Sequence, residues 1–285
     1  IRELLEVADK NCYEIWQVVL LNEIKISGLS EKEIFKKLDD RLEVMEKSAE
    51  RALENSLKTA GGLIEGVANT HYSYYKENKS ISGSFVNLIM ARALSCSEVN
   101  AAMGKICAAP TAGACGIIPA VIVSMGEKYK LKRKEMLEAL LTASGIGAVI
   151  TKNATVSGAE GGCQAECGVA AAMSASAAVQ MAGGTNEMSI NAGCFALMNC
   201  MGLICDPIAG LVQVPCAQRN ASQAVNAILS ADLAMAGMKS VIPADEVIEA
   251  MYKVGKSLPI QLKETALGGI AFTPTGRDIT KKIFG

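Results

Sequence analysis

Aromatic residues are scarce in this sequence: Phe, Trp and Tyr make up 4% of the 285 residues, although 50% of the residues are hydrophobic. The hydrophobic content comes mainly from Ala, Leu, Ile, Val and Met, and the chain has 26 Gly residues in addition. Small side chains let helices approach one another closely, whereas large aromatic side chains fill wider gaps between layers. The composition therefore favours close-packed helices over a sandwich with an aromatic core.

An excess of one charge is also missing, because 28 Lys and Arg residues face 29 Asp and Glu residues. No basic stripe is present, which excludes nucleic acid and membrane surfaces as partners. Residues 194–216 form the longest apolar stretch, but they include Asp206 and two prolines. Residues 168–184 are rich in Ala and Ser and barely long enough to cross a bilayer. We interpret both stretches as buried parts of a soluble protein.

Cysteine, in contrast, is abundant, with ten residues. A secreted scaffold held by disulfides is one alternative, but the chain is too long and too apolar for that class and has no signal peptide. We therefore expect a cytoplasmic protein whose reduced thiols are free to bind a metal. Six of the ten lie in one region: Cys163, Cys167, Cys194, Cys200, Cys205 and Cys216.

Hydrophobic spacing indicates helices along most of the chain. It predicts one helix over residues 1–26, ended by Gly28, and a capping box at Ser30 and Glu33 that opens a helix to about Ala60. Further helices are expected at residues 84–104, 132–152, 163–180, 188–201 and 220–238, and from Pro243 onward.

The remaining segments read as irregular. Residues 63–83 are less regular, residues 153–162 form a polar loop that contains Gly, and residues 267–276 form a tail segment that bears Gly and Pro. Residues 116–124 contain a β-branched run typical of a strand, but Pro119 argues against a central strand. The sequence thus predicts an all-α protein: a single compact domain over residues 1–285, with close-packed helices and an irregular loop that bears cysteines.

That loop is the stretch 202–219, which Pro207, Gly210 and Pro215 prevent from forming one regular helix or strand. It carries Cys205 and Cys216, and Cys163 lies upstream in a Gly-flanked segment. Three thiolates on irregular backbone suit an iron–sulfur cluster with one open iron. The spacing matches neither a zinc ribbon nor a ferredoxin, and buried cysteines often serve only as small hydrophobic residues, so spacing alone does not select the ligands.

A second feature is the turn Thr111–Gly116, which leads into the start of a helix. Free backbone N–H groups and the helix dipole at such a place bind anions, for example a carboxylate. Lys105 and Arg219 are candidates for additional positive charge. The alternative is a tight turn between packed helices.

Three motifs resemble the α chain of iron–sulfur-dependent L-serine dehydratase: residues 109–119 (APTAGACGIIP), 157–166 (SGAEGGCQAE) and 205–216 (CDPIAGLVQVPC). They occur in the family's order over nearly the whole chain, and residues 265–276 resemble the family's ending. The resemblance implies a [4Fe–4S] cluster held by Cys163, Cys205 and Cys216. It further implies that L-serine is deaminated to pyruvate and ammonia without pyridoxal phosphate.

The same resemblance frames the other site residues. We expect Asp206, Gln164 and Glu166 to orient the cluster ligands. The substrate-binding candidates are Thr111, Ala112, Gly113, Asn153, Ser157 and Arg219.

The general base is not identified by the sequence. Lys105, Lys152 and His71, the lone histidine, are candidates; a lone histidine is more often structural, and its segment departs from the family's Gly-rich pattern. The base is otherwise expected from a separate β chain, which the two-chain form of the family requires, as a heterodimer or larger assembly. No cysteine follows Cys216, so we expect an exposed fourth iron and sensitivity to oxygen.

Three alternatives stay open at this point. The first is a related lyase with the same cluster scaffold, such as an L-cysteine desulfidase-like enzyme. Otherwise the chain is a non-catalytic subunit whose thiols only pack, or an enzyme that uses pyridoxal phosphate through a Schiff-base lysine.

Overall fold

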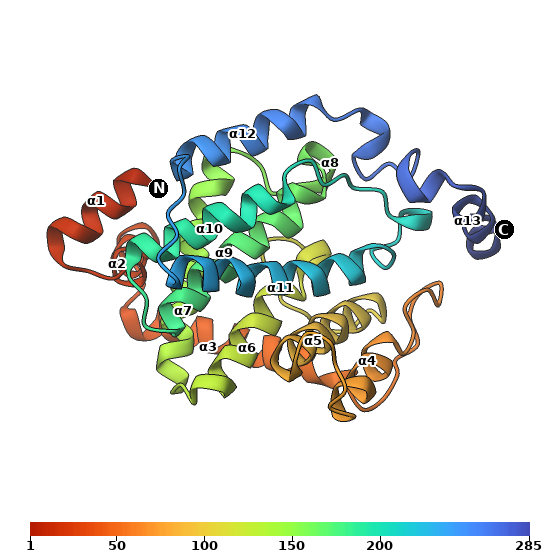
Figure 1. Ribbon diagram of the computed structural model, residues 1–285, viewed down its shortest axis with the longest axis horizontal. Coiled ribbons are helices and arrows are strands. Elements are labelled where there is room, and N and C mark those ends of the chain that lie inside the picture. The colour runs from red at the N-terminus through yellow and green to blue at the C-terminus, as the bar shows by residue number, and fades with distance from the viewer.

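Every regular element of the chain is helical (Figure 1), and the computed structural model describes residues 1–285. The only β-type contact is an isolated parallel bridge between Cys205 and Lys263. The predicted all-α class is confirmed, and the helices pack into one body. None of them combines the length and apolar character needed to cross a membrane.

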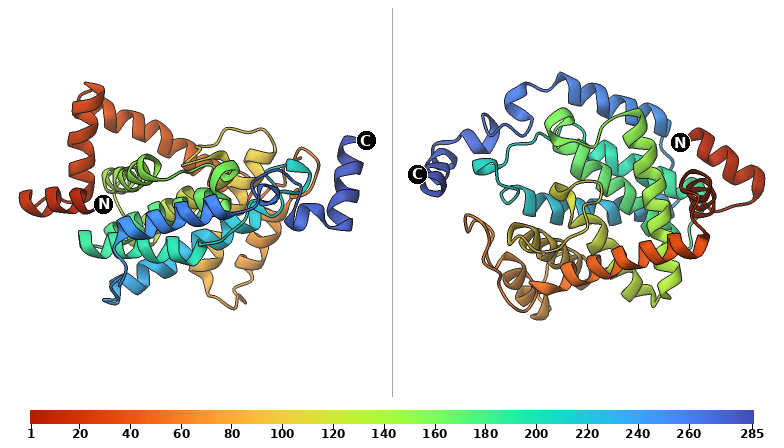
Figure 2. Two further views of the ribbon diagram at one scale, coloured as in Figure 1. Left: turned by 90° about the horizontal axis from the view of Figure 1, so that it is seen from above. Right: turned by 180° about the vertical axis from the view of Figure 1, so that it is seen from behind.

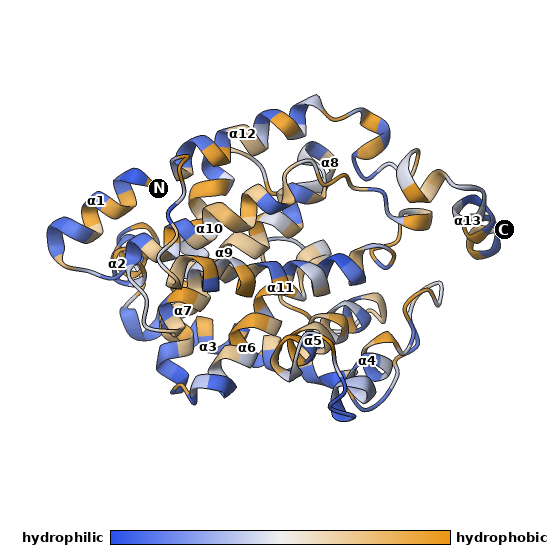
Figure 3. Cartoon of the chain, viewed as in Figure 1, coloured by the Kyte–Doolittle hydropathy of each residue, from blue (hydrophilic) through white to orange (hydrophobic).

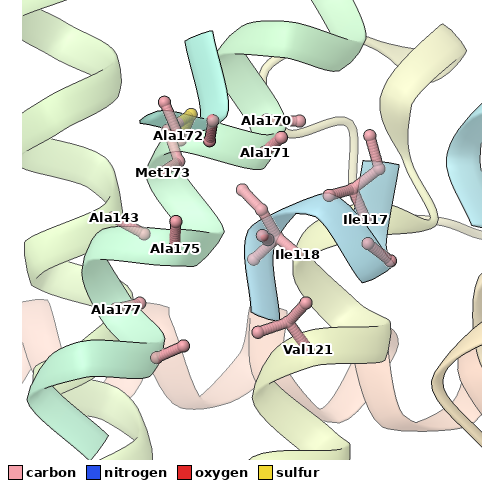
Figure 4. Packing of buried hydrophobic residues seen from close by; sticks show 14 of the residues in the cluster. Ile117, Ile118, Val121, Ala143, Ala170, Ala171, Ala172, Met173, Ala175 and Ala177 are labelled. Carbon is pink, nitrogen blue, oxygen red and sulfur yellow. The ribbon is translucent and has the colours of Figure 1, made fainter. Parts of the chain in front are cut away.

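The centre of the molecule is α9 (Val169–Met181), in which all residues but Gln180 are buried. A helix that is apolar all round must be enclosed by other helices. Four of them pack against it: α6 (Ile117–Tyr129), α7 (Arg133–Asn153), α10 (Asn186–Cys200) and α11 (Cys216–Met235). Figure 4 shows the small side chains of α9 facing Ile118 and Val121 of α6, and Figure 3 shows hydrophobic residues gathered on these central helices.

Small residues set the spacing between these helices. A Cβ atom on Gly193 of α10 would lie 2.9 Å from Ser176 Oγ of α9, and that hydroxyl donates to the carbonyl of Ser189 at 2.8 Å. The scarcity of aromatic residues in the sequence therefore corresponds to direct contact between helix backbones.

The other helices form an outer layer. α5 (Ser84–Ala101) packs on α11 and is itself covered by α3 (Glu31–Arg51) and α4 (Val67–Lys76), while α2 (Ile15–Ser27) covers α7 and α12 (Ala244–Ser257) covers α10. α1 (Arg2–Asn11) and α13 (Pro274–Phe284) lie at opposite ends of the long axis (Figures 1 and 2). The short elements are η1 (Ala112–Ala114), α8 (Gly158–Gly161), η2 (Gln164–Gly168), η3 (Ile208–Gly210), η4 (Ile260–Leu262) and η5 (Gly269–Phe272).

Several predicted boundaries are wrong. The expected helix over residues 1–26 is two helices, because Cys12 adopts a left-handed conformation with φ 54° and ends α1. The capping box of Ser30 and Glu33 is present, but its helix ends at Arg51 rather than Ala60. Residues 63–83 contain α4, a helix whose polar sequence hid it and which is stabilised by packing on α5.

Two further segments differ in detail. The β-branched run 116–124 is helical, with Pro119 in the first turn of α6, where a missing N–H costs nothing. The segment 267–276 contains η5 and the start of α13.

Gly116 sits at the start of α6, where the backbone of α5 comes closest. A Cβ there would lie 2.5 Å from the carbonyl oxygen of Ala93, and that oxygen cannot move without shifting α5. We expect Gly116→Ala to lower the free energy of unfolding by about 1–3 kcal/mol, as overpacking typically does. Urea unfolding of the purified chain measures the effect.

Gly126 in the same helix is the matched control. A Cβ at Gly126 would meet the flexible end of Met136, with Cε and Sδ at 2.9 Å, and Met side chains adapt readily. Gly126→Ala should be neutral or stabilising, because Ala is favoured over Gly in helices by about 1 kcal/mol. Equal losses in the two variants would contradict this account of helix spacing.

Candidate active site

Cys163 precedes a π-helical turn, η2, that leads into α9. Gly162 before it has φ 77°, and a Cβ there would lie 2.9 Å from the carbonyl oxygen of Leu203, so this approach requires glycine. π-turns interrupt helices most often at functional sites. The predicted helix over residues 163–180 therefore begins with an irregular turn, and the regular helix α9 starts only at Val169.

Gln164 fixes this turn from within. Its side chain is 1% exposed and donates to the carbonyls of Gly161 at 2.9 Å and Met251 at 3.1 Å, while its Oε1 accepts from the N–H of Gly202 at 2.8 Å. It thereby joins the Cys163 segment to α12 and to the loop that leads to Cys205.

The Cys205 loop is held by backbone pairing with the C-terminal segment. The N–H of Cys205 donates to Leu262 O at 2.9 Å, and Cys205 O accepts from the N–H of Glu264 at 2.8 Å. Farther along, the N–H of Ile208 donates to Val214 O at 2.9 Å and closes the loop. Pro207, Gly210 and Pro215 were expected to prevent one regular element over residues 202–219. The structure has only the short η3 before Pro215, but α11 begins at Cys216, four residues before the predicted start of that helix.

Asp206, which is buried, and Arg219, whose side chain is 16% exposed, form an ion pair across this loop. Arg219 Nη2 donates to Asp206 Oδ1 at 2.8 Å and Arg219 Nη1 donates to Ile204 O at 2.8 Å, while Asp206 Oδ2 accepts from the N–H of Ile270 at 2.8 Å. Burial lowers the pKa of Arg219, but the negative charges of Cys163 and Asp206 outweigh this effect, so the pKa is raised overall. Arg219 was a substrate-binding candidate from the sequence, but its guanidinium binds Asp206 and Ile204 and so stabilises the loop.

Cys216 is the first residue of α11, and Asn220 lies one turn later. Asn220 is 1% exposed; its Nδ2 donates to Gly113 O at 2.7 Å and to Cys216 O at 2.8 Å, and its Oδ1 accepts from the N–H of Gly116 at 2.8 Å. It ties the start of α11 to the Thr111–Gly116 turn. Asn220 was not predicted from the sequence; the signal that could have indicated it is an amide one helical turn after a cysteine.

Glu166 lies where these segments meet. It is 8% exposed, its Oε1 accepts from Thr111 Oγ1 at 2.8 Å, and its Oε2 lies 4.0 Å from Cys205 Sγ. Burial raises the pKa of the Glu166 carboxyl, the Thr111 hydroxyl opposes this, and the charge of Glu264 adds to it. The carboxylate therefore connects the predicted anion-binding turn with one of the predicted cluster ligands.

The three predicted ligand thiols are all buried: Cys163 and Cys205 are 3% exposed and Cys216 is 8% exposed. A hydrogen bond with Cys167, whose sulfur lies 3.4 Å away, lowers the pKa of Cys163. Burial, followed by the charge on Cys163, raises the pKa of Cys205, and the same two causes raise that of Cys216 to about 12. The three thiols thus share one electrostatic environment.

The donor set suits an iron–sulfur cluster in its chemistry. Thiolates are the ligands of such clusters, and these three come from separate irregular segments of a buried region. No three His, Cys, Asp or Glu side chains lie close enough together to hold a single metal ion. All ten cysteines are free.

The remaining candidates fall in different places. Thr111, Ala112 and Gly113 lie beside Glu166, and Ser157 precedes Gly158, whose Cβ would lie 2.6 Å from Glu166 Oε2. Lys152 and Asn153 are exposed and line a groove between α1, α2 and α7.

The other two candidate bases lie on other elements. Lys105 is exposed in a hollow beside α3, whose other lining residues include Asp40 and Glu43. His71 is half-buried on α4; its Nε2 has no partner, and burial lowers its pKa. Neither side chain hydrogen-bonds to a residue of the cysteine region, and the identity of the base stays a prediction.

Comparison with known proteins supplies the family. The model described as "Serine dehydratase alpha chain" matches residues 10–271. "L-serine dehydratase, alpha chain" from Peptoniphilus asaccharolyticus is 51% identical over 280 residues, which cover 98% of this chain and 96% of that protein. "Probable L-serine dehydratase, alpha chain" from Bacillus subtilis is 45% identical, covering 100% of this chain and 95% of that protein.

A longer relative matches over part of its length. "L-serine dehydratase" from Helicobacter pylori is 36% identical over 279 residues, which cover 95% of this chain but 61% of that protein. The resemblance inferred from the three motifs is confirmed, and this chain belongs to the serine dehydratase alpha chain family.

Proposed function

We propose that this chain is the α subunit of an iron–sulfur-dependent L-serine dehydratase, a lyase that converts L-serine to pyruvate and ammonia. The observation that supports the proposal is that Cys163, Cys205 and Cys216 are buried on irregular or helix-terminal backbone, and that the buried Glu166 is one of the charges that act on the pKa of each thiol. Family membership over nearly the whole chain supports the substrate.

Cys163, Cys205 and Cys216 would hold the [4Fe–4S] cluster. A cluster bound by these three thiolates would supply a Lewis-acidic iron that favours loss of the substrate hydroxyl. The protein supplies the surroundings: Gln164, Asp206 and Asn220 are each about 1% exposed and fix the three cysteine segments by hydrogen bonds. Their burial keeps water away from the ligands, and their hydrogen bonds orient the backbone that carries the sulfur atoms.

The Thr111–Gly116 turn is the proposed site for the substrate carboxylate. The N–H groups of Ala112 and Gly113 donate to no acceptor in the protein. Two free N–H groups in succession make a polar concavity that attracts an anion. Bound there, the substrate lies beside Glu166 and Cys205, with Ser157 at the edge of the same region.

A β chain is the proposed partner. The α-chain relatives match this chain along nearly their whole length, whereas the Helicobacter pylori protein is considerably longer than the matched part. Lys105, Lys152 and His71 form no hydrogen bonds with the cysteine region, so we infer that the β chain completes the catalytic machinery. Ten free thiols fit the reducing environment of the cytoplasm.

We expect Cys163→Ala, Cys205→Ala and Cys216→Ala each to lose iron, acid-labile sulfide and serine-dependent pyruvate formation together. One missing thiolate leaves an iron without its protein ligand. Iron and sulfide analysis after anaerobic reconstitution, paired with the pyruvate assay, measures the effect. Cys194→Ala is the control, because Cys194 is equally buried within α10 but far along the helix from the loop. Full iron content in Cys205→Ala would refute the ligand assignment.

The second prediction concerns the β chain. The reconstituted α chain alone should bind its cluster but form pyruvate slowly or not at all, and adding the β chain should restore turnover and shift the α chain to a larger species in size-exclusion chromatography. Ammonia release from L-serine, compared with sulfide release from L-cysteine, separates this function from a desulfidase. Full turnover by the α chain alone would contradict the need for a partner.

A further inference from the structure

Only one of the two oxygens of the buried Glu166 carboxylate accepts a close hydrogen bond. Oε1 accepts from Thr111 Oγ1 at 2.8 Å, but the polar atom recorded nearest to Oε2 is Cys205 Sγ, 4.0 Å away. No Lys, Arg or His side chain forms an ion pair with it; Arg219, the nearby cation, is paired with Asp206. A buried charge without a partner is costly, so this oxygen calls for a cationic donor from outside the chain.

This inference rests on the proposed function, under which Glu166 Oε2 also loses the Cys205 thiol as a donor. Cys205 as a cluster ligand is a thiolate, and a thiolate has no proton to donate. Glu166 Oε2 then has no donor in this chain.

Two glycines make room for the Glu166 carboxylate itself. A Cβ on Gly158 would lie 2.6 Å from Oε2, and a Cβ on Gly113 would lie 3.0 Å from Oε1 and 3.1 Å from Oε2. Neither glycine has the positive φ that would explain it by backbone conformation. Both positions therefore lack side chains because the carboxylate occupies the space beside them.

The position of Glu166 matches the shape of the substrate. On one side Thr111 joins the carboxylate to the turn proposed for the substrate carboxylate, and on the other side lies Cys205. L-Serine carries its carboxylate, ammonium and hydroxymethyl groups on one carbon atom. A molecule that spans from the turn to the cluster thus holds its ammonium beside Glu166.

We propose that Glu166 binds the α-ammonium group of L-serine and so selects amino acids over hydroxy acids of the same shape. The ammonium supplies both the missing donor and the missing positive charge. Glu264, an exposed carboxylate whose N–H donates to Cys205 O, lies at the edge of the same region and is the matched comparison.

Glu166→Gln tests the proposal, because it keeps the size of the side chain and an oxygen for Thr111 while removing the charge. We expect the KM for L-serine to rise about 10- to 100-fold, the range for loss of one charged hydrogen bond. Calorimetric binding of L-alanine, which keeps the ammonium but has no hydroxyl to lose, should weaken by the same factor. Binding of 3-hydroxypropanoate, which lacks the ammonium, should not weaken and should strengthen if it changes, because the variant removes a negative charge that repels its carboxylate.

Controls separate this proposal from its premise. Glu264→Gln should leave all three values within about twofold, and Glu166→Asp should restore part of the preference for L-alanine. Iron and sulfide content of the αβ enzyme reports the proposed function independently: a wild-type protein without a cluster defeats that function, not the ammonium assignment. Equal weakening of L-alanine and 3-hydroxypropanoate, an unchanged KM, or loss of iron in Glu166→Gln would each overturn the role of Glu166.

Discussion

The three thiols lie on backbone that cannot satisfy its own hydrogen bonds, and this constraint shapes the whole region. Buried N–H and C=O groups outside regular helices need partners from elsewhere. Each cysteine is followed by a buried polar residue that supplies them: Gln164 after Cys163, Asp206 after Cys205, and Asn220 one turn after Cys216. Each bonds to a different segment of the chain, so the irregular backbone that presents one thiol also fixes a neighbouring segment.

The small-residue core makes this arrangement possible. α9 and α11 begin at or just after cysteine segments, and α6 begins just after the Thr111–Gly116 turn. Because Ala, Ser and Gly line the contacts of α9 with α6, α10 and α11, the backbones approach closely and the ends of three helices meet. Larger core residues would hold these ends apart, and side chains as short as Asn220 would no longer reach from α11 to the turn.

Local patterns in the sequence identified most of the helices but not the contacts between them. The capping box of Ser30 and the break at residues 202–219 depend on neighbours in sequence, and both were found. Other features depend on how helices pack: the ion pair between Arg219 and Asp206, the π-turn after Cys163, and the place of Lys152 in a groove between α1, α2 and α7. α4 was missed for the same reason, since its contacts with α5 outweigh a polar sequence.

The distribution of charge within the site explains why a zwitterion suits it. Burial and the charge of Cys163 are the largest causes of the raised pKa values of Cys205 and Cys216, and the charges of Glu166 and Glu264 raise them further. The nearby cation, Arg219, is paired with Asp206. Such a region repels a simple anion. An amino acid carries its own cation next to its carboxylate, so the acidic side of the site and the N–H groups of Ala112 and Gly113 each meet the opposite charge. The ammonium contact does not offset the desolvation of the carboxylate, and the carboxylate contact does not offset that of the ammonium. The two contacts together therefore favour an amino acid over a simple carboxylic acid or a simple amine.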